Sequence, residues 1–144
     1  MTPTKLFTRL GEEITEESTI CMSDEWHRFP SNFFLPSHIK IRFTRGNITT
    51  QLPQLFSDST TEAGGRFNRK NMFESSSVIS PSKCDYHITL SDSMDSNARI
   101  CMIMIDSSTP APCRWVYIPW YCEEKVKYKY LCAIPENGKD SMNK

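Results

Sequence analysis

The sequence predicts an α+β fold: a mainly antiparallel β domain with one short N-terminal helix and a long central loop. Three observations support this class. A helical apolar stripe lies near the N-terminus, several later segments alternate apolar and polar residues, and a central stretch is poor in apolar groups. The 144 residues suit a single domain with a substantial core. We expect a helix or linker over 1–17, a domain over 18–135 and a polar tail over 136–144.

The helix is expected from Thr4 to Glu17. Its apolar residues recur near the three- to four-residue spacing of one helical face, where they form a stripe of Leu6, Phe7, Leu10 and Ile14. Gly11 interrupts this stretch and lowers its helix propensity by about 1 kcal/mol relative to alanine.

Two strands are expected in the first half of the chain. Thr19 to Met22 is a short strand candidate, and His38 to Thr44 alternates apolar with basic residues, as in a half-buried strand. Between them lies the densest aromatic stretch, from Trp26 to Pro36. Two prolines six residues apart exclude a regular helix there, so the stretch is interpreted as an extended, buried loop.

Residues 57–82 differ in composition from the rest of the chain. They contain paired glycines, a run of three serines and few apolar residues. This composition predicts a long surface loop, anchored locally at Val78 and Ile79.

The second half predicts four further strands. Asp85 to Leu90 alternates, and Arg99 to Ile105 is a continuous apolar run, typical of a strand buried on both faces. Trp115 to Ile118 is a third candidate. Glu124 to Leu131 places Tyr128 and Tyr130 on an inner face and lysines on the other. About six strands and one helix result.

Charge and cysteine content limit the classes of function. Lys plus Arg equal Asp plus Glu at 17 each, so nothing indicates a nucleic-acid partner. No apolar run reaches the roughly 20 residues of a membrane helix, and no secretory signal is visible. Six cysteines suit an oxidising compartment, although buried free thiols are an alternative. The acceptor triplet Asn47-Ile48-Thr49 also fits a secretory lumen. With these two features, the missing signal suggests that the protein's start lies elsewhere.

No catalytic or metal-binding constellation emerges from the sequence. Cys84 and His87 are three apart, which on a strand places them on opposite faces. The three histidines and the cysteines match no zinc spacing, and no cofactor motif occurs. Adjacent acids such as Asp24-Glu25 are interpreted as solvated surface.

Two features have two interpretations each. Lys125, Lys127 and Lys129 form either a contact for phosphate or a lipid headgroup, or the solvent-facing side of an edge strand, where lysines deter aggregation. The aromatic stretch is either a buried plug or a surface that stacks on sugar rings.

The segment Asp24-Glu-Trp-His-Arg-Phe-Pro-Ser-Asn-Phe-Phe-Leu-Pro36 resembles a signature of the dolichyl-phosphate-mannose-dependent α-1,2-mannosyltransferases of asparagine-linked glycosylation (glycosyltransferase family 22, GT-C type), in their C-terminal lumenal region. That family has glycine and lysine before the Glu-Trp pair, where this chain has Ser23 and Asp24. The similarity runs from about Ser18 to Pro135. Further matching positions are Cys21, Gln51, Leu52, Pro53, Phe56, Asn71, Glu74, Lys83, Cys84, Tyr86, Leu90, Asp106, Arg114, Tyr117, Pro119, Tyr128 and Tyr130.

The resemblance implies the C-terminal lumenal part of an endoplasmic reticulum membrane enzyme. Such an enzyme transfers mannose from dolichyl-phosphate mannose to a lipid-linked oligosaccharide. The family's catalytic acid lies in an earlier lumenal loop, so no residue here is assigned to catalysis, and this chain alone is expected to be inactive. The implied partners are the enzyme's own membrane domain and the lipid-linked oligosaccharide.

The resemblance also suggests an acceptor-side or packing surface. Its residues are Trp26, His27, Arg28, Phe29, Phe33 and Phe34. Cys21 and Cys84 flank the best-matched region, and we expect them to form a disulfide. The other four cysteines allow three pairings. Asn47 is a candidate for N-glycosylation. The alternative function is a stand-alone lumenal module that binds glycans or a partner without catalysis.

Overall fold

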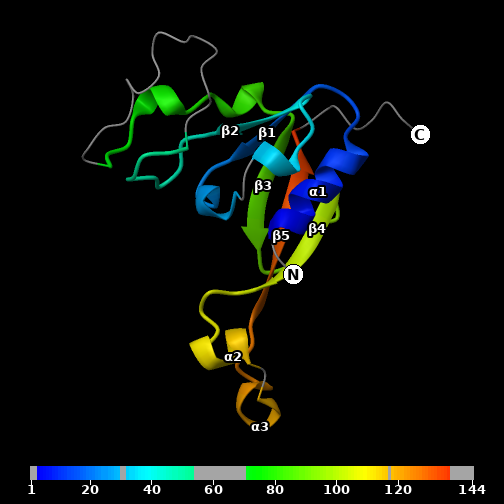
Figure 1. Ribbon diagram of the computed structural model, residues 1–144, viewed down its shortest axis with the longest axis vertical. Helices are drawn as coiled ribbons and strands as arrows, with labels where there is room; N and C mark the ends of the chain where they lie inside the picture. The colour runs from blue at the N-terminus through cyan, green and yellow to red at the C-terminus, as the bar shows by residue number, and fades with distance from the viewer. Residues whose placement is uncertain (1–2, 30–31, 54–70, 117, 137–144) are drawn as a thin grey trace.

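The computed structural model describes residues 3–29, 32–53, 71–116 and 118–136. Its centre is a mixed five-stranded sheet in the order β2-β1-β3-β5-β4 (Figure 1). The strands are β1 Ser18–Met22, β2 Ile39–Phe43, β3 Tyr86–Ser91, β4 Ile100–Ile105 and β5 Tyr128–Pro135. The antiparallel ladders β3–β5 and β4–β5 have six residue pairs each, against five and three in the parallel ladders β1–β2 and β1–β3. The α+β class with mainly antiparallel pairing is therefore confirmed.

Helix α1, Pro3–Glu13, supplies much of the core. Leu6, Phe7 and Leu10 are completely buried in the cluster that also contains the inward side chains of the sheet. The expected continuation to Glu17 is wrong. After Ile14, whose N–H still donates to the Leu10 carbonyl, the chain leaves the helix so that the Ser18 N–H reaches the His38 carbonyl beside β2.

Strand β4 lies at the edge of the sheet, which corrects the expectation of burial on both faces. Ile100, Met102 and Met104 are buried, whereas Ile103 and Ile105 are 44% and 39% exposed. Every residue of β4 is apolar, but only the face that lies toward α1 is covered. The other face of this edge strand is open to solvent, so its apolar residues do not show burial.

The expected strand at 115–118 is also wrong. The chain instead forms helix α2, Ala111–Trp115, and helix α3, Pro119–Cys122. Prolines occupy the first turn of both helices, where a missing N–H costs nothing, and the Cys113–Cys122 disulfide holds the two together. Strand β5 consequently begins only at Tyr128 rather than at Glu124.

The central loop is described from residue 71 onward, and the earlier part of the predicted loop lies outside the described residues. Two short 3-10 turns, Ser75–Ser77 and Pro81–Lys83, belong to this part. The predicted anchor is present: the Ile79 N–H donates to the Phe43 carbonyl at 2.8 Å, and Val78 packs against the core.

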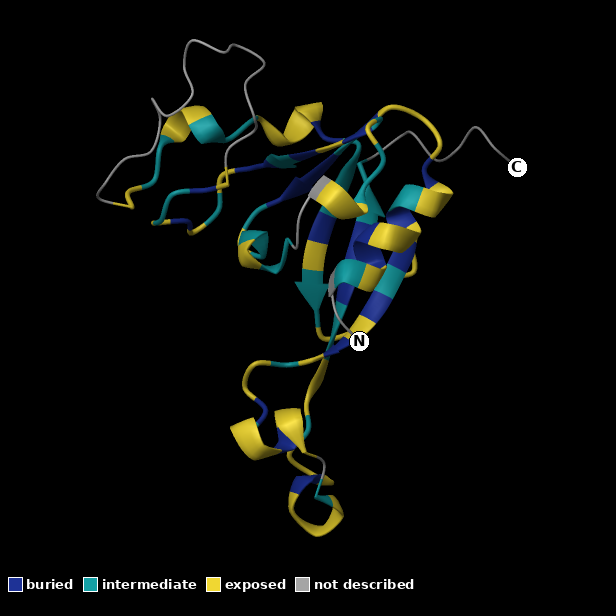
Figure 2. Ribbon diagram, viewed as in Figure 1, coloured by how far each residue is buried: buried dark blue, intermediate teal, exposed yellow. Residues whose placement is uncertain are grey.

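Residues 106–127 connect β4 to β5 and form a projecting segment, called the lobe below. In Figure 2 the lobe extends away from the sheet and is mostly exposed, while the buried residues concentrate between α1 and the strands. None of the described helices is long and apolar enough to cross a membrane.

Candidate functional site

The aromatic segment connects β1 to β2 and contains two 3-10 turns, Trp26–Arg28 and Asn32–Phe34. In the first turn, the Arg28 N–H donates to the Glu25 carbonyl and the Phe29 N–H to the Trp26 carbonyl. The interpretation as an extended loop is therefore wrong. Prolines exclude a long helix, but they leave room for single turns of three residues.

The inner half of this segment is an anchor. The Phe29 ring meets Phe7 of α1 edge-on at 5.5 Å and Phe43 of β2 edge-on at 6.4 Å between centroids. Trp26 also packs against the core cluster. The buried-plug interpretation therefore holds for Trp26 and Phe29, which fix the segment to both the helix and the sheet.

A close backbone approach fixes the far end of the segment. A Cβ atom placed on Gly11 of α1 would lie 2.8 Å from Cδ of Pro36. Any side chain at Gly11 would collide with this rigid ring, so the glycine that weakens α1 is what lets Pro36 lie against it.

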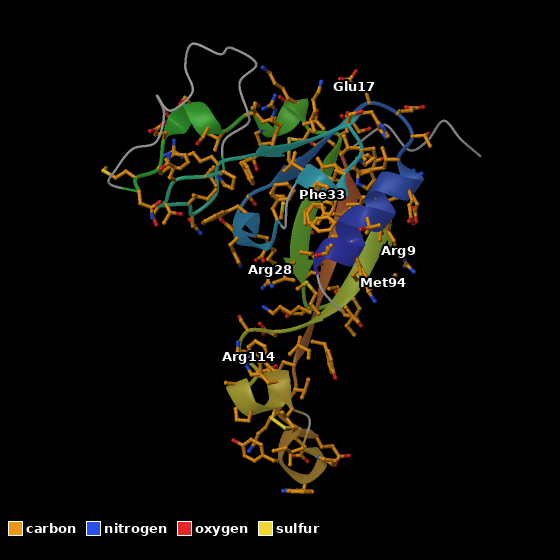
Figure 3. The ribbon with its side chains drawn as sticks, in the orientation of Figure 1. Arg9, Glu17, Arg28, Phe33, Met94 and Arg114 are labelled. Carbon is orange, nitrogen blue, oxygen red and sulfur yellow. A yellow bond between two sulfur atoms is a disulfide. The ribbon has the colours of Figure 1, made fainter. Side chains whose placement is uncertain are left out.

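The outer half of the segment faces solvent. His27 is exposed, Phe33 is 88% exposed and Phe34 is 39% exposed, with the two phenylalanine rings edge-on at 5.7 Å. The Arg28 guanidinium is paired with Glu25 at the base of the first turn. Arg28 and Phe33 both emerge from the connection between β1 and β2 (Figure 3). We call His27, Arg28, Phe33 and Phe34 the aromatic surface.

Asp24 holds the neighbouring loop against the start of this segment. Its Oδ1 accepts a hydrogen bond from the Asn47 N–H at 2.7 Å. A Cβ at Gly46 would lie 2.2 Å from the same oxygen, so this contact requires a glycine. The Asn47 side chain is exposed while Ile48 is buried, an arrangement that leaves the acceptor amide accessible; its glycosylation stays a prediction.

All six cysteines are paired. The structure joins Cys21 in β1 to Cys84 just before β3, the pair expected from the resemblance, with 5.8 Å between their Cα atoms. The remaining pairs are Cys101–Cys132 and Cys113–Cys122. Cys101 and Cys132 are directly opposite each other on β4 and β5. This disulfide could not be predicted from the sequence, because it depends on the register in which the two strands pair.

The described residues contain no assembled catalytic or metal site. The Cys84 sulfur belongs to a disulfide, which excludes the thiolate that a Cys–His mechanism requires. His87 Nε2 lies 2.8 Å from Glu136 Oε2, and His38 Nε2 lies 2.8 Å from the Ile14 carbonyl. Within the described ranges no three His, Cys, Asp or Glu side chains gather as metal ligands would.

The three lysines near β5 do not form one common face. The Lys125 ammonium lies 3.5 Å from the centroid of the Tyr121 ring, and Lys129 contacts Asp92 and Asp106 at 3.8 and 3.9 Å. Strand β5 is internal to the sheet, so the edge-strand interpretation is wrong. Tyr128 is 53% exposed, which corrects its expected place in the core.

Asp106 closes the base of the lobe. Its Oδ2 accepts a hydrogen bond from the Ser108 hydroxyl at 2.8 Å. This bond, with smaller help from the Ser108 N–H, Lys129 and the Ser107 hydroxyl, holds the pKa of Asp106 below its usual 3.8. Next to it, the Thr109 hydroxyl accepts from the Lys127 N–H at 3.0 Å, which joins the two ends of the lobe.

Fold and site together define a disulfide-braced α+β domain with an exposed aromatic surface, and comparison with known proteins shows what this domain resembles. Six curated α-1,2-mannosyltransferases match part of the chain, so the chain is similar to a region of mannosyltransferases. All six are ALG9-type enzymes, and this is an ALG9-like region, as the aromatic signature indicated. No family model matches the chain, and no solved structure matches it significantly.

The matches differ in reach. The mouse α-1,2-mannosyltransferase ALG9 is 35% identical over 74 residues, which cover 49% of this chain and 12% of the mouse protein. The Caenorhabditis elegans enzyme is 32% identical over 103 residues, covering 57% of this chain and 17% of the relative. The Arabidopsis thaliana enzyme is 28% identical over 138 residues, covering 83% and 24%. The chain thus spans between about an eighth and a quarter of the length of these relatives.

Proposed function

We propose that this chain is the C-terminal lumenal portion of an endoplasmic reticulum α-1,2-mannosyltransferase. The complete enzyme would transfer mannose from dolichyl-phosphate mannose to the lipid-linked oligosaccharide of protein N-glycosylation. The observation that carries the proposal is the aromatic segment between β1 and β2, whose sequence carries the resemblance to the family's signature. Three disulfides also suit the oxidising lumen.

In this proposal the domain positions substrate rather than performing chemistry. The resemblance matches no residue of this chain to the family's catalytic acid, so that acid would belong to another part of the enzyme. Phe29 and Trp26 hold the segment to the core, and this anchoring orients Phe33 and Phe34 outward. Exposed aromatic faces can stack on the apolar face of a sugar or pack on a membrane domain. In the first case the aromatic surface would contact the acceptor oligosaccharide, and in the second it would hold this domain against the membrane part of the enzyme.

The test uses the native gene that encodes this chain. Replacement of Phe33 and Phe34 by serine should cause a truncated lipid-linked oligosaccharide to accumulate, which chromatography of the released glycans would detect. Met94→Ser is the matched control, because Met94 is 67% exposed and lies outside the aromatic surface. An unchanged oligosaccharide profile in the double variant, with the protein at its normal level, would contradict the proposed role.

The stand-alone binding module is the second candidate, and the edge-on contact that holds the Phe33 ring against the Phe34 ring supports it. Trp26 lies in the same segment, 6.1 Å from the His27 ring, and provides a fluorescent reporter. Titration of the isolated chain with mannose oligosaccharides should change this fluorescence if the module binds glycans, and Phe33→Ser should remove the change. No response at millimolar ligand would count against a glycan-binding module.

A further inference from the structure

The lobe is a small, separately braced unit. The chain leaves the sheet at Ile105 of β4 and returns at Tyr128 of β5, which are directly opposite each other. Between them, the Cys113–Cys122 disulfide joins α2 to α3, and the buried Thr109 joins the two ends of the lobe through Lys127. The side chains on α2 and α3 are therefore presented by a constrained scaffold.

This scaffold exposes large apolar side chains. Trp115 and Trp120 are 84% and 89% exposed, Val116 is 64% exposed and Tyr121 is 42% exposed. We call these four residues the aromatic tip. None of the lobe residues that the structure describes belongs to the hydrophobic core cluster, so the aromatic tip is not the outer edge of the protein's interior. Exposed clusters of large apolar side chains mark surfaces that bind something apolar.

The charges around the aromatic tip are nearly balanced. Arg114 precedes Trp115, while Lys125 and Lys127 follow α3, and Lys125 stacks on the Tyr121 ring. Glu123 and Glu124 are also exposed. Three cations against two carboxylates leave a net charge of about +1, which is too small for electrostatic attraction to dominate. The apolar side chains would supply the main driving force.

We propose that the aromatic tip inserts into the interfacial layer of a phospholipid bilayer. Trp and Tyr favour this layer because their rings have an apolar body and a polar edge. Arg and Lys beside them extend their charged ends toward lipid phosphates. The lobe extends along the long axis of the molecule (Figure 1), so a flat membrane would meet the aromatic tip before the sheet.

The exposure of the tryptophans favours a membrane over a sugar ligand. A sugar platform needs an aromatic ring held in one orientation with polar groups converging beside it. Trp120 leaves 89% of its surface uncovered, so few neighbours hold its ring. Insertion into a lipid headgroup layer needs no such orientation. This inference is independent of the mannosyl-transfer reaction proposed above and concerns a different surface from Phe33 and Phe34.

The experiment measures binding of the 144-residue chain to phosphatidylcholine vesicles by flotation. The chain should float with the vesicles, and addition of phosphatidylserine should raise the bound fraction only about twofold or threefold. Trp115→Ser and Trp120→Ser should each weaken binding roughly tenfold, since each removes a large apolar contact. Phosphatidylcholine brominated on its acyl chains should quench the tryptophan fluorescence.

Two variants separate the aromatic tip from the rest of the molecule. Trp26→Phe leaves only the two lobe tryptophans, so its quenching by brominated lipid should equal or exceed that of the parent chain. Met94→Ser removes an exposed apolar side chain outside the lobe and should bind like the parent chain. Unchanged thermal unfolding of the serine variants would show that reduced binding does not reflect misfolding.

Several results would overturn the inference. The parent chain could stay at the bottom of the gradient, without the vesicles. Alternatively, the Trp115→Ser, Trp120→Ser double variant could float to the same extent as the parent chain. A fluorescence response of the Trp26→Phe protein, whose tryptophans both lie in the lobe, to free mannose oligosaccharides without vesicle binding would assign the aromatic tip to carbohydrate instead. A tryptophan-dependent dimer that does not bind vesicles would assign it to a second copy of the chain.

Discussion

Gly11 illustrates how a single residue has opposite meanings in the sequence and in the structure. From propensity alone it is a weak point in α1, whereas its lack of a side chain lets Pro36 lie against the helix. Glycine in a helix interior is therefore explained by its neighbour in space. The same reasoning applies to Gly46, which makes room for the Asp24 carboxylate.

Gly11→Ala should destabilise the protein although alanine is the better helix former. The new Cβ would lie 2.8 Å from a proline ring that cannot rotate away, and such overpacking costs about 1–3 kcal/mol. Urea unfolding would measure the loss. Glu12→Ala, at an exposed position of the same helix, should change the free energy of unfolding by less than about 0.5 kcal/mol. A Gly11→Ala protein as stable as the parent would refute the clash.

Asp106 gives a prediction about pH. Its pKa is lowered in the folded protein, so its contribution to stability is present above the unfolded value near 3.8 and is lost as the pH falls through the lower folded value. Asp106→Asn should therefore lower the melting temperature near pH 7, by about 2 °C or less because the pairing is exposed to water.

The difference between the Asp106→Asn and parent proteins should shrink toward zero as the pH is brought well below 3.8. Thermal unfolding followed by circular dichroism from pH 7 to pH 2.5 would measure it. Ser93→Ala, a change at an exposed turn residue, supplies the control for general effects of acid. A difference that stays constant over this range would show that the Asp106 charge plays no part.

At the scale of elements, alternation predicted β2 and β3 well, but it placed the start of β5 too early, at Glu124 instead of Tyr128. β2 and β3 lie where the alternation placed them, because one face of each packs toward the core and the period of two is visible. β1 is also a strand as expected, although four of its five residues are buried and no alternation marks it. Hydrophobicity alone does not say whether a strand such as β4 is central or at an edge. The sequence pattern predicts a strand at residues 115–118, because the pattern does not show that a disulfide joins Cys113 to Cys122 and so holds this connection in two short helices.

The candidate site was predicted in part for a similar reason. The aromatic signature located the segment and its flanking disulfide, but it could not divide the aromatic residues into core and surface. That division depends on Phe7 and Phe43, which come from α1 and β2 and meet Phe29 only in the folded chain.

The disulfides should differ in their contribution to stability according to the length of chain they enclose. Cys21–Cys84 spans 63 residues and Cys113–Cys122 spans 9. Loop entropy assigns about 4 kcal/mol to the first and about 2–3 kcal/mol to the second. Replacing the first pair by serines should lower the denaturation midpoint of the whole domain. Replacing the second should mainly loosen the lobe.

Urea unfolding combined with hydrogen exchange would distinguish the two disulfides. Amides of β1 and β3 should lose protection in the Cys21→Ser, Cys84→Ser protein, and amides of α2 and α3 in the Cys113→Ser, Cys122→Ser protein. Equal loss of protection across the sheet in both would contradict a separately braced lobe.

At the scale of the whole molecule, the described residues form a core-containing body and a lobe without a share in that core. The body buries α1 against the sheet, and the lobe relies on one disulfide and the polar contacts of Asp106 and Thr109. This division has a direct consequence for engineering, since the lobe should be removable.

Replacing residues 106–127 by Asn-Gly should leave a folded body. Ile105 and Tyr128 are opposite each other in antiparallel strands, the geometry that a two-residue turn closes. We expect a cooperative thermal transition within about 5 °C of the parent, measured by circular dichroism. A chain that fails to fold would show that the lobe contributes to the body's stability. Replacing the same residues by Gly-Gly instead of Asn-Gly would test whether the turn sequence affects stability.

The position of β5 imposes an order on folding during synthesis. This last strand lies between β3 and β4, so the sheet stays split until the ribosome has released residues 128–135. The first three strands and the Cys21–Cys84 bond can form earlier, whereas β4 has no partner strand while it waits. Nascent chains should therefore expose the apolar side chains of β4 to chaperones for the time taken to translate the lobe. A stop codon before β5 would leave β4 permanently without its partner strand. We therefore expect the truncated protein to be degraded by quality control, whether or not it keeps its binding surfaces.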